Sequence, residues 1–586
     1  MPALRKAPTK TQQAHAMLSD PHLYELFDVF ARHRPGANRP VRPADLACFI
    51  LDVESRIYGN RQQVEAANAA PTVWAKKRKL VREFSGRTLP SVPPGPDTVR
   101  KWRSRWLPPL DRTEDVSVPE VLTDLLDAAT KLGAKRARKL GQFKAHQPRN
   151  FADPSPRHNV SMDGTWLSPF SHAKSWTDPQ GVERLLRSKA KSKATIREQQ
   201  VVHSTTKDGR KVMGVNHVVG VTRTKYGRVF LGVQRALRGE NLAALELTER
   251  IVEHTEDGMH SLTYDKGFHG WTTDYLAAKH GIQTVIPAKV ATAGRTEEEQ
   301  LDHMLAEQAL RVPQFDAQET LRRTGNDTTT RNARSQTTKK KAKARAKKSI
   351  RPNNTLIEAM AHDRQAERHD LAGLIAKTQK GIPTGHGLPL GTSHYVSSQN
   401  KLITVRSQHD FYRDIKHTHP RGSVCTHSVH VDDGAFWVVD WYDGAWHKTQ
   451  RVTCSHSAPV ADPVTGHHTI VSTHQLYCRQ TRSFLDFDTI YEPRHKPGKP
   501  TPAESAARSK QQKALALMQP IARCDERFRR AYGLRNDIES WFSDMKNRLL
   551  ADRRAASLDL NHQMLDVLYA GMVTNALALR IYRYEH

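Results

Sequence analysis

The sequence has few cysteines, no long apolar run and far fewer acidic than basic residues. Its five cysteines are odd in number and widely spaced along 586 residues, so we do not expect a disulfide framework. The first residues contain no apolar stretch typical of a signal peptide, and no segment approaches the roughly 20 apolar residues that a membrane span requires. These absences predict a cytoplasmic protein rather than a secreted or membrane protein.

The acidic residues are too few to balance the basic ones. The chain has 91 Lys and Arg against 61 Asp and Glu, a formal net charge of +30, and its isoelectric point is about 10.0. Solubility does not require such an excess, whereas the phosphate backbone of nucleic acid attracts it directly. We therefore expect association with DNA of the nucleoid. A membrane surface is the second candidate partner, but no basic amphipathic helix with an apolar face is evident.

The length predicts several domains, and the residue pattern changes several times along the chain. We expect an α/β protein, in which a mixed sheet with flanking helices is interrupted by a β-rich insertion and preceded by a helical domain. The expected segments are a helical DNA-binding domain (1–130), a basic linker (131–150), the first part of the sheet domain (151–290), a basic helical or disordered linker (291–385), the β-rich insertion domain (386–500) and the C-terminal helices of the sheet domain (501–586).

The N-terminal helices end in a strongly basic one. The segment GPDTVRKWRSRW (95–106) has Asp97 as a candidate N-cap and places Arg100, Lys101 and Arg103 around two tryptophans. Short helices that end in a basic helix are typical of helix-turn-helix proteins, so we expect these three residues to contact DNA. The alternative is a basic helical bundle whose tryptophans are buried.

Two aspartates lie at the ends of expected strands, and glycine follows each of them closely. Asp163 stands in SMDGTW and Asp265 in TYDKGFHG. Catalytic groups gather where the strands of an open sheet end, and glycine allows backbone and substrate to approach closely. An Asp-Gly pair by itself is most often a turn, so neither motif is decisive alone.

A third acidic residue lies on an expected helix near the end of the sequence. In AYGLRNDIESWFSDMKNRL (531–549), Tyr532, Arg535, Glu539 and Lys546 stand at offsets of zero, three, seven and fourteen. At about 100° per residue these offsets place all four within a roughly 60° arc of one helix. The neighbouring arc is apolar, as expected of a helix that packs on a core. An ordinary amphipathic helix with incidental charges would show the same stripe.

The combination of these motifs resembles the Asp-Asp-Glu (DDE) transposases of bacterial insertion sequences. DGT on a first strand, DKGF on a later strand and Y-x2-R-x3-E-x6-K on a helix match that pattern, and the last motif is the YREK signature of insertion-sequence family four. The resemblance covers about 151–290 and 505–586. A long β-rich insertion before the last carboxylate is common in this family. The N-terminal region matches only in general character.

The resemblance implies an RNase H-like fold and a metal-dependent DNA transposase. Asp163, Asp265 and Glu539 would be the catalytic residues and would hold two Mg²⁺ ions, with Mn²⁺ able to substitute, since hard oxygen ligands suit these cations. Two such ions stabilise the attacking and leaving oxygens of an in-line displacement, which suits cleavage at transposon ends and strand transfer into target DNA. A homodimer acting on paired ends is a further expectation from the resemblance.

The residues that share the helical arc with Glu539 are expected to contact DNA. Arg535 and Lys546 would hold phosphates near the scissile bond. Tyr532 would hydrogen-bond a phosphate or stack beneath a displaced base. These roles follow from the shared arc alone.

Two further features follow only from the resemblance. In related enzymes a tryptophan of the inserted domain stabilises a flipped base. The segment GAFWVVDW is, however, primarily typical of a strand with alternating core residues. The candidates for that role are Trp437, Trp441 and Trp446. The Lys266-Gly267-Phe268 turn is expected to shape the site.

The insertion also concentrates soft metal ligands. They form the pairs Cys425-x-His427, Cys454-x-His456 and His474-x3-Cys478. Residues i and i+2 share one face of a strand, so four such side chains could form a tetrahedral zinc site. The chain has no CxxC motif and contains 30 histidines, so the sequence does not single out a zinc site.

Two other functions are the alternatives to a transposase. A catalytically inactive relative that only binds DNA would have lost a carboxylate or the signature, and all are present. A nuclease of the RNase H-like group that cuts without joining would use the same three acids, and the sequence does not separate it from a transposase.

Overall fold

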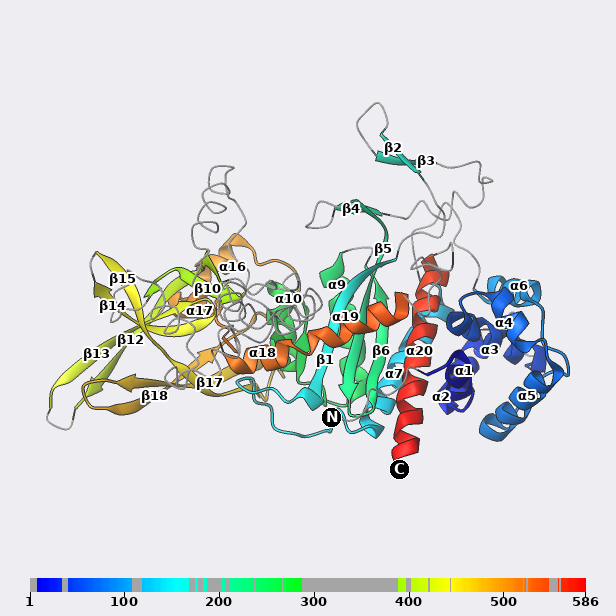
Figure 1. The fold of residues 1–586 in the computed structure, drawn as a ribbon. Helices are drawn as coiled ribbons and strands as arrows, with labels where there is room; N and C mark the ends of the chain where they lie inside the picture. The colour runs from blue at the N-terminus through cyan, green and yellow to red at the C-terminus, as the bar shows by residue number, and fades with distance from the viewer. Residues whose placement is uncertain are drawn as a thin grey trace, which may run out of the picture. The chain divides into compact units, whose positions relative to one another are not determined.

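The computed structural model contains a mixed α/β region, two larger antiparallel sheets and an N-terminal helical region (Figure 1). It describes residues 8–33, 41–107, 118–167, 174–177, 183–186, 202–205, 211–236, 239–265, 268, 270–286, 388–396, 402–419, 422–442, 444–519, 521–522, 525–546, 557 and 560–586. The chain divides into two compact units. The first comprises Met1–Pro148, Ser155–Phe268 and Gly533–His586, and the second comprises Arg149–Pro154 and His269–Tyr532.

The central sheet has five main strands in the order β6-β5-β1-β7-β8. These strands are β1 (Asn159–Leu167), β5 (Lys211–Thr224), β6 (Gly227–Arg235), β7 (Ser261–Thr263) and β8 (Gln283–Val285). Strand β5 is antiparallel to both β1 and β6, whereas β7 is parallel to β1. Counted along the chain, the order is therefore 3-2-1-4-5. This confirms the expected mixed sheet with flanking helices.

The same part of the chain also contains three short strands and one helical turn. β4 (Val202–Thr205) pairs with the first residues of β5, and β2 (Lys174–Thr177) pairs with β3 (Glu183–Leu186). A 3-10 turn at Pro156–His158 leads into β1. None of the candidate site residues lies on these short elements.

The helices of the first unit form an N-terminal group and a group that flanks the sheet. They are α1 (Lys10–Leu18), α2 (Pro21–Arg32), α3 (Pro43–Tyr58), α4 (Arg61–Asn68), α5 (Pro71–Ser85), α6 (Pro96–Trp106), α7 (Glu120–Lys139), α9 (Glu240–Thr255), α19 (Arg535–Asp544) and α20 (Leu560–Glu585). Helices α3, α5 and α6 confirm the expected N-terminal helices, and each has proline in its first turn. Helix α7 continues through 131–139, which the sequence pattern assigned to a linker.

The start of α6 differs in detail from the expectation. Its N-cap is Gly95, with Pro96 at the first helical position, so Asp97 lies in the first turn instead of at the cap. The proline accounts for this, because its fixed φ and missing N–H suit the first helical position. Asp97 still carries negative charge at the end of the helix where the dipole favours it.

One apolar core joins the N-terminal helices to α20. Phe49 of α3 contacts Trp102 of α6 and Tyr569 of α20, with ring centroids 6.3 Å and 5.9 Å apart. Trp102 and Trp106 are buried, as in the helical-bundle alternative. Helix α20 is long and apolar enough to span a membrane by length and composition alone, but 72% of its apolar window is buried within the protein. We therefore describe α20 as a core helix.

A buried ion-pair network also holds α6 in place. Arg103 lies 3.2 Å from an oxygen of Asp52 on α3 and 2.8 Å from an oxygen of Asp566 on α20. The arginine is 2% exposed, and both carboxylates are buried. The structure thus corrects the expectation that Arg103 contacts DNA, because its guanidinium is buried in the core and pairs with Asp52 and Asp566. Arg100 and Lys101, which also lie on α6, are exposed.

The second unit contains the β-rich insertion that the sequence predicted. One antiparallel sheet has the order β12-β13-β14-β15-β9, another has β16-β17-β18, and β10 pairs with β11. The strands are β9 (Leu388–Pro389), β10 (Thr392–Val396), β11 (Leu402–Arg406), β12 (His409–Thr418), β13 (Val424–Asp432), β14 (Ala435–Tyr442), β15 (Ala445–Arg451), β16 (Thr453–Ala461), β17 (His468–Cys478) and β18 (Ser483–Tyr491). Hairpins join β13 to β14 and β14 to β15.

The two larger sheets of the second unit share a small apolar core. Val429 and Val431 of β13, Leu476 of β17 and Phe487 of β18 are buried in it, and Phe436 lies 5.9 Å from Phe487 between ring centroids. The helices of this unit are α10 (Trp271–His280), α16 (Pro502–Ala507), α17 (Lys510–Leu515) and α18 (Glu526–Tyr532). The linker expected over 291–385 lies outside the described residues.

Replacing Arg103 with methionine should destabilise the first unit strongly. The change leaves the buried carboxylates of Asp52 and Asp566 without this partner, and we expect a loss of about 3–5 kcal/mol in the free energy of unfolding. Arg100→Ala is the matched control on the same helix: it breaks only an exposed pair with Asp97 and should cost less than about 0.5 kcal/mol. Chemical denaturation followed by tryptophan fluorescence measures both, and equal stabilities of the two variants would contradict the core position of Arg103.

Candidate active site

Asp163 and Asp265 occupy equivalent positions beside each other in the sheet. Strands β1 and β7 are parallel, and Ser161 stands opposite Thr263. Each aspartate follows its paired residue by two positions: Asp163 lies within β1 and Asp265 just past the end of β7. The charge of Asp265 acts on Asp163, so the two carboxylates are neighbours. Since neighbouring strands lie about 4.8 Å apart, this register brings together two carboxylates from distant parts of the chain.

The residues next to the two aspartates identify which face Asp163 occupies. The hydroxyl of Tyr264 donates to Glu240 Oε1 on α9 at 2.9 Å. A Cβ added at Gly164 would lie 2.5 Å from Glu240 Oε2. Both neighbours therefore face α9, and the alternation of β1 turns Asp163 toward the opposite face.

Helix α19 brings the third acid to that opposite face. Arg535, its first residue, donates from one terminal nitrogen to Asp163 Oδ2 at 2.9 Å and from the other to Glu539 Oε1 at 2.6 Å. One guanidinium therefore joins the carboxylate on β1 to the carboxylate on α19. The Asp163 side chain is 14% exposed and that of Glu539 is 49% exposed, so the group reaches the surface of the first unit.

Apolar packing and an ion pair hold α19 on the sheet. The buried residues of the predicted apolar stripe are Ile538, Trp541, Phe542 and Met545. Trp541 stacks on Phe230 of β6 with ring centroids 5.6 Å apart. Asp537 accepts from Arg223 of β5 at 2.6 Å. These contacts fix the side of α19 that carries Arg535 and Glu539.

The four residues of the YREK motif do not lie on one continuous helix. Helix α18 ends at Tyr532, a turn follows at Gly533, and α19 begins at Arg535. Glycine inside a helix costs about 1 kcal/mol relative to alanine, which favours a break at this point. Arg535 and Glu539 share α19 as the helical arc predicted, whereas Tyr532 lies on a separate helix.

The other two residues of the motif lie beyond the ends of α19. Lys546 is half-buried in a π-helical turn that follows Asp544. Tyr532 belongs to the second unit, where its ring stacks on Phe528 at 5.3 Å with an angle of 13° between the planes. Their expected DNA contacts remain predictions.

Burial makes the charge on Asp163 costly. It raises the pKa of Asp163 to about 6, although the Arg535 guanidinium acts in the opposite direction and lowers it. The like charges of Glu240 and Asp265 raise this pKa further. A buried carboxylate in these surroundings is stabilised by added positive charge, which a divalent cation supplies.

The donor atoms of this site suit a hard divalent cation. Asp163, Asp265 and Glu539 offer carboxylate oxygens only, which Mg²⁺ and Mn²⁺ prefer over nitrogen or sulfur. Asp163 and Glu539 already share a cationic partner in Arg535. The donor chemistry of the three acids thus suits a hard cation, and in the structure the Arg535 guanidinium supplies positive charge to two of them. Among the described residues, the group whose ligand atoms lie close enough to hold a metal is a different one, made of histidines and cysteines.

Glu240 is a residue of this region that the sequence does not single out. It is the first residue of α9 and accepts from Asn216 at 2.6 Å and from Tyr264 at 2.9 Å. An acidic residue in the first turn of a helix is common because it complements the helix dipole. Its contact with the backbone at Gly164 depends on tertiary packing, so no local signal in the sequence reveals it.

The tryptophan candidates in the insertion fall into two groups. Trp437 is 5% exposed and belongs to the core of the second unit. Trp441 and Trp446 are 61% and 40% exposed and face each other across β14 and β15, with ring centroids 5.3 Å apart. The exposed pair is sterically free to stack on a base, and Trp437 has the core position that strand alternation predicted. Of the Lys266-Gly267-Phe268 turn, the structure describes only Phe268, which is buried.

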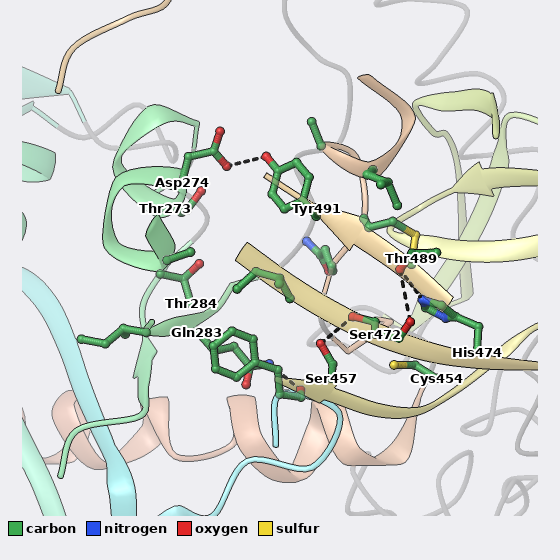
Figure 2. Close-up of a pocket in the computed structure, with 18 residues that line it drawn as sticks. Thr273, Asp274, Gln283, Thr284, Cys454, Ser457, Ser472, His474, Thr489 and Tyr491 are labelled. Carbon is green, nitrogen blue, oxygen red and sulfur yellow. Dashed lines mark hydrogen bonds between the residues drawn. The ribbon is translucent and has the colours of Figure 1, made fainter. Parts of the chain in front are cut away.

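The soft ligands of the insertion also separate. His474 and Cys454 line a cavity of about 140 Å³ in the second unit, shown in Figure 2. There His474 contacts the Thr489 hydroxyl at 3.1 Å, and burial lowers the pKa of His474 to about 4. The Cys454 thiol donates to the His456 carbonyl at 3.3 Å. The structure places Cys425, His427 and Cys478 together elsewhere in the unit.

No protein-family model matches the chain, and no curated protein sequence is significantly similar to it. The function is therefore inferred from the sequence motifs and from the geometry of the side chains within each unit.

Gly164→Ala should disturb the sheet beside Asp163. The added Cβ would lie 2.5 Å from Glu240 Oε2 and 2.9 Å from Asn216 Oδ1. Because Asn216 and Tyr264 hold Glu240 in place, we expect a loss of about 1–3 kcal/mol in the free energy of unfolding. Thermal unfolding measures the change. In a Glu240→Ala background the closest contact is removed and only the one with Asn216 Oδ1 remains, so the loss should become smaller. Strictly additive effects in this double-mutant cycle would refute the steric explanation.

Proposed function

We propose that this chain is a DNA transposase of the DDE type, built on a catalytic core of RNase H-like fold. The sheet order 3-2-1-4-5, with antiparallel β1, β5 and β6 and a parallel β7, supports that fold. The link that Arg535 makes between Asp163 and Glu539, with Asp265 just after the neighbouring strand, is the observation that carries the proposal.

The three acids would hold the metal from two kinds of support, strand and helix. Asp163 and Asp265 come from adjacent strands, so backbone register sets their spacing. Glu539 comes from a helix and is the more exposed acid of the Arg535 pair, so it has more room to adjust. Bound Mg²⁺ supplies positive charge that activates an oxygen nucleophile and stabilises the leaving oxygen at a phosphodiester.

The proposed reaction has two steps at the same site. Water attacks the phosphorus at the transposon end, the bond from phosphorus to the 3′ oxygen breaks, and a free 3′-hydroxyl and a 5′-phosphate result. That 3′-hydroxyl then attacks a phosphodiester of the target, so one ester bond forms as another breaks. Arg535 balances the acids when DNA is absent, and we assign it a contact with a DNA phosphate when DNA is bound.

The DNA surface of the proposed enzyme includes basic residues outside this site. Arg100 and Lys101 are exposed on α6, as a contact with the phosphate backbone requires. Lys546 follows α19 and would hold a phosphate near the scissile bond. Action as a homodimer on paired ends is part of the proposal and rests on the family resemblance.

Glu539→Gln should reduce Mg²⁺-dependent cleavage to the uncatalysed background while DNA affinity stays within about twofold, because the amide keeps the shape of the side chain but supplies no charged ligand. The probe is a labelled duplex carrying the DNA that flanks the gene, including any short inverted repeats. Asp544→Asn is the matched control on the same helix: its carboxylate pairs with Arg228 at the surface, and its loss should leave cleavage unchanged. Retained cleavage in Glu539→Gln would refute the assigned role.

A second arm of that assay separates joining from cutting alone. Duplexes with pre-cut 3′ ends are mixed with a supercoiled target plasmid, and joined products are counted. Wild-type protein should join them with Mg²⁺ or Mn²⁺, and Glu539→Gln should not. Cleavage of the uncut duplex without any joining of pre-cut ends would overturn the transposase proposal in favour of a nuclease.

Arg535→Ala should make the folded protein more responsive to divalent cations. The change leaves the carboxylates of Asp163 and Glu539 without their shared guanidinium, so Mn²⁺ or Mg²⁺ replaces more of the lost charge than in the wild type. Thermal unfolding without DNA should show a lower Tm in cation-free buffer and a cation-induced increase larger than that of the wild type, by about 2–4 °C per kcal/mol of added stabilisation.

Arg223→Ala is the control for this experiment, since Arg223 pairs with Asp537 of the same helix and with none of the three candidate ligands in the pairs described. Its cation-induced increase in Tm should equal that of the wild type. If Arg535→Ala shows no larger increase than Arg223→Ala, then Asp163 and Glu539 do not share a cation site.

A further inference from the structure

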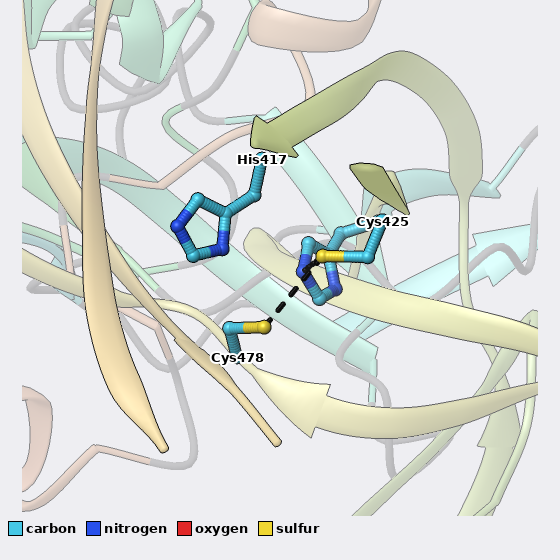
Figure 3. Close-up of side chains that lie close together, drawn as sticks. His417, Cys425 and Cys478 are labelled. Atoms are coloured by element: carbon cyan, nitrogen blue, oxygen red, sulfur yellow. Dashed lines mark hydrogen bonds between the residues drawn. The ribbon is translucent and has the colours of Figure 1, made fainter. Parts of the chain in front are cut away.

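A second group of potential metal ligands lies in the second unit. His417, Cys425, His427 and Cys478 each offer one ligand atom, and these four atoms lie within 4.8 Å of one another. Cys425 Sγ is 3.3 Å from His427 Nε2 and 3.6 Å from Cys478 Sγ. Figure 3 shows the side chains of His417, Cys425 and Cys478 directed toward one common space.

The strand register explains how this group forms. His417 of β12 and Cys425 of β13 are directly opposite each other in an antiparallel pair, so their side chains share one face. His427 stands two residues after Cys425 on β13 and lies on the same face. Cys478 is the last residue of β17, in the other sheet of the unit. Three ligands thus come from one hairpin, and the fourth comes from a different sheet.

We propose that these four side chains bind one Zn²⁺ ion as a structural site. Zinc–sulfur bonds of about 2.3 Å and zinc–nitrogen bonds of about 2.0–2.1 Å at tetrahedral angles separate two sulfurs by about 3.8 Å and a sulfur from a nitrogen by about 3.6 Å. The observed separations of 3.6 Å and 3.3 Å are each within about 0.3 Å of these values. Four protein ligands leave no open position, as in structural rather than catalytic zinc sites.

The surroundings of the four side chains favour a metal. Cys478 is 0% exposed and Cys425 is 9% exposed, and both carry free thiols. The Nδ1 atom of His417 is buried and has no hydrogen-bond partner among the residues that the structure describes. A bound zinc ion would use such buried soft atoms, which otherwise lose their contacts with water on folding.

A further imidazole lies just outside the four ligands. His419 Nε2 is 3.0 Å from Cys425 Sγ, and its backbone N–H donates to the Ser423 carbonyl at the turn between β12 and β13. A histidine N–H directed at a metal-bound thiolate stabilises the negative charge on sulfur and orients the ligand. We assign His419 this supporting position, with His417 as the ligand opposite Cys425.

The proposed ion would join the two sheets of the second unit. The ligands on β12 and β13 belong to the five-stranded sheet, and Cys478 belongs to the three-stranded sheet. Their shared apolar core is small, so a bond across the sheets stabilises the folded insertion directly. This site uses none of the carboxylates of the proposed active site, so the two proposals stand or fall separately.

Metal analysis of the purified full chain tests the zinc site. Protein expressed in zinc-supplemented medium and freed of loose metal should contain about one zinc per chain. Cys425→Ser and Cys478→Ser should each lower this to less than roughly 0.2 per chain. Cys454→Ser is the matched control, because its thiol lies in the same unit and bonds the His456 carbonyl instead, and it should keep the full zinc content.

Two measurements on the wild-type chain keep the proposal testable if a cysteine variant fails to fold. Replacement of zinc by Co²⁺ should give the intense visible absorption of a tetrahedral site with thiolate ligands. A chelator that removes zinc but not Mg²⁺ should lower the Tm, and added zinc should restore it. The proposal is overturned if the wild-type chain holds less than roughly 0.2 zinc per chain and takes up none on titration, or if mass spectrometry finds Cys425 and Cys478 joined in a disulfide.

Discussion

The parallel pairing of β1 with β7 is the constraint on which the candidate active site depends. With Ser161 opposite Thr263, Asp163 and Asp265 each follow the last pair by two residues, which brings these two parts of the chain together. A shift of one residue in this register would turn one of them toward α9, where Tyr264 and Gly164 now meet Glu240. The chain crosses from β1 to β7 through β5, β6 and α9, so the packing of these elements maintains the register.

A second constraint is electrostatic. Carboxylates gathered at a partly buried site repel one another and lose contact with water, which the raised pKa of Asp163 expresses. Arg535 reduces that cost by bonding both Asp163 and Glu539, and α19 is anchored by Trp541 and Asp537 so that the guanidinium stays in reach. The guanidinium is therefore an internal counter-charge for the carboxylates of this site.

Much of the fold follows from local patterns. The strands at NVSMDGTWL and GAFWVVDWY, the helix at ENLAALELTERIVEHT and the hairpins at DDG and YDG were all predictable, because side-chain alternation, helical periodicity and turn residues act over a few neighbours. The break at Gly533 and the core position of Arg103 were not. Arg103 lies on the same basic helix as Arg100, but its burial depends on Asp52 and Asp566 from distant segments.

The sequence by itself determined which chemical groups are available: three acids near glycine or on a charged helix, and histidines and cysteines concentrated in the insertion. Tertiary structure decided which of these groups meet. His417, and not His474, is the neighbour of Cys425 and Cys478. The reason is strand pairing, which places His417 opposite Cys425 regardless of spacing along the chain. Tertiary structure also added Glu240 to the surroundings of Asp163. Local patterns act through bonded neighbours, whereas a site forms from side chains that only the packing of separate elements brings together.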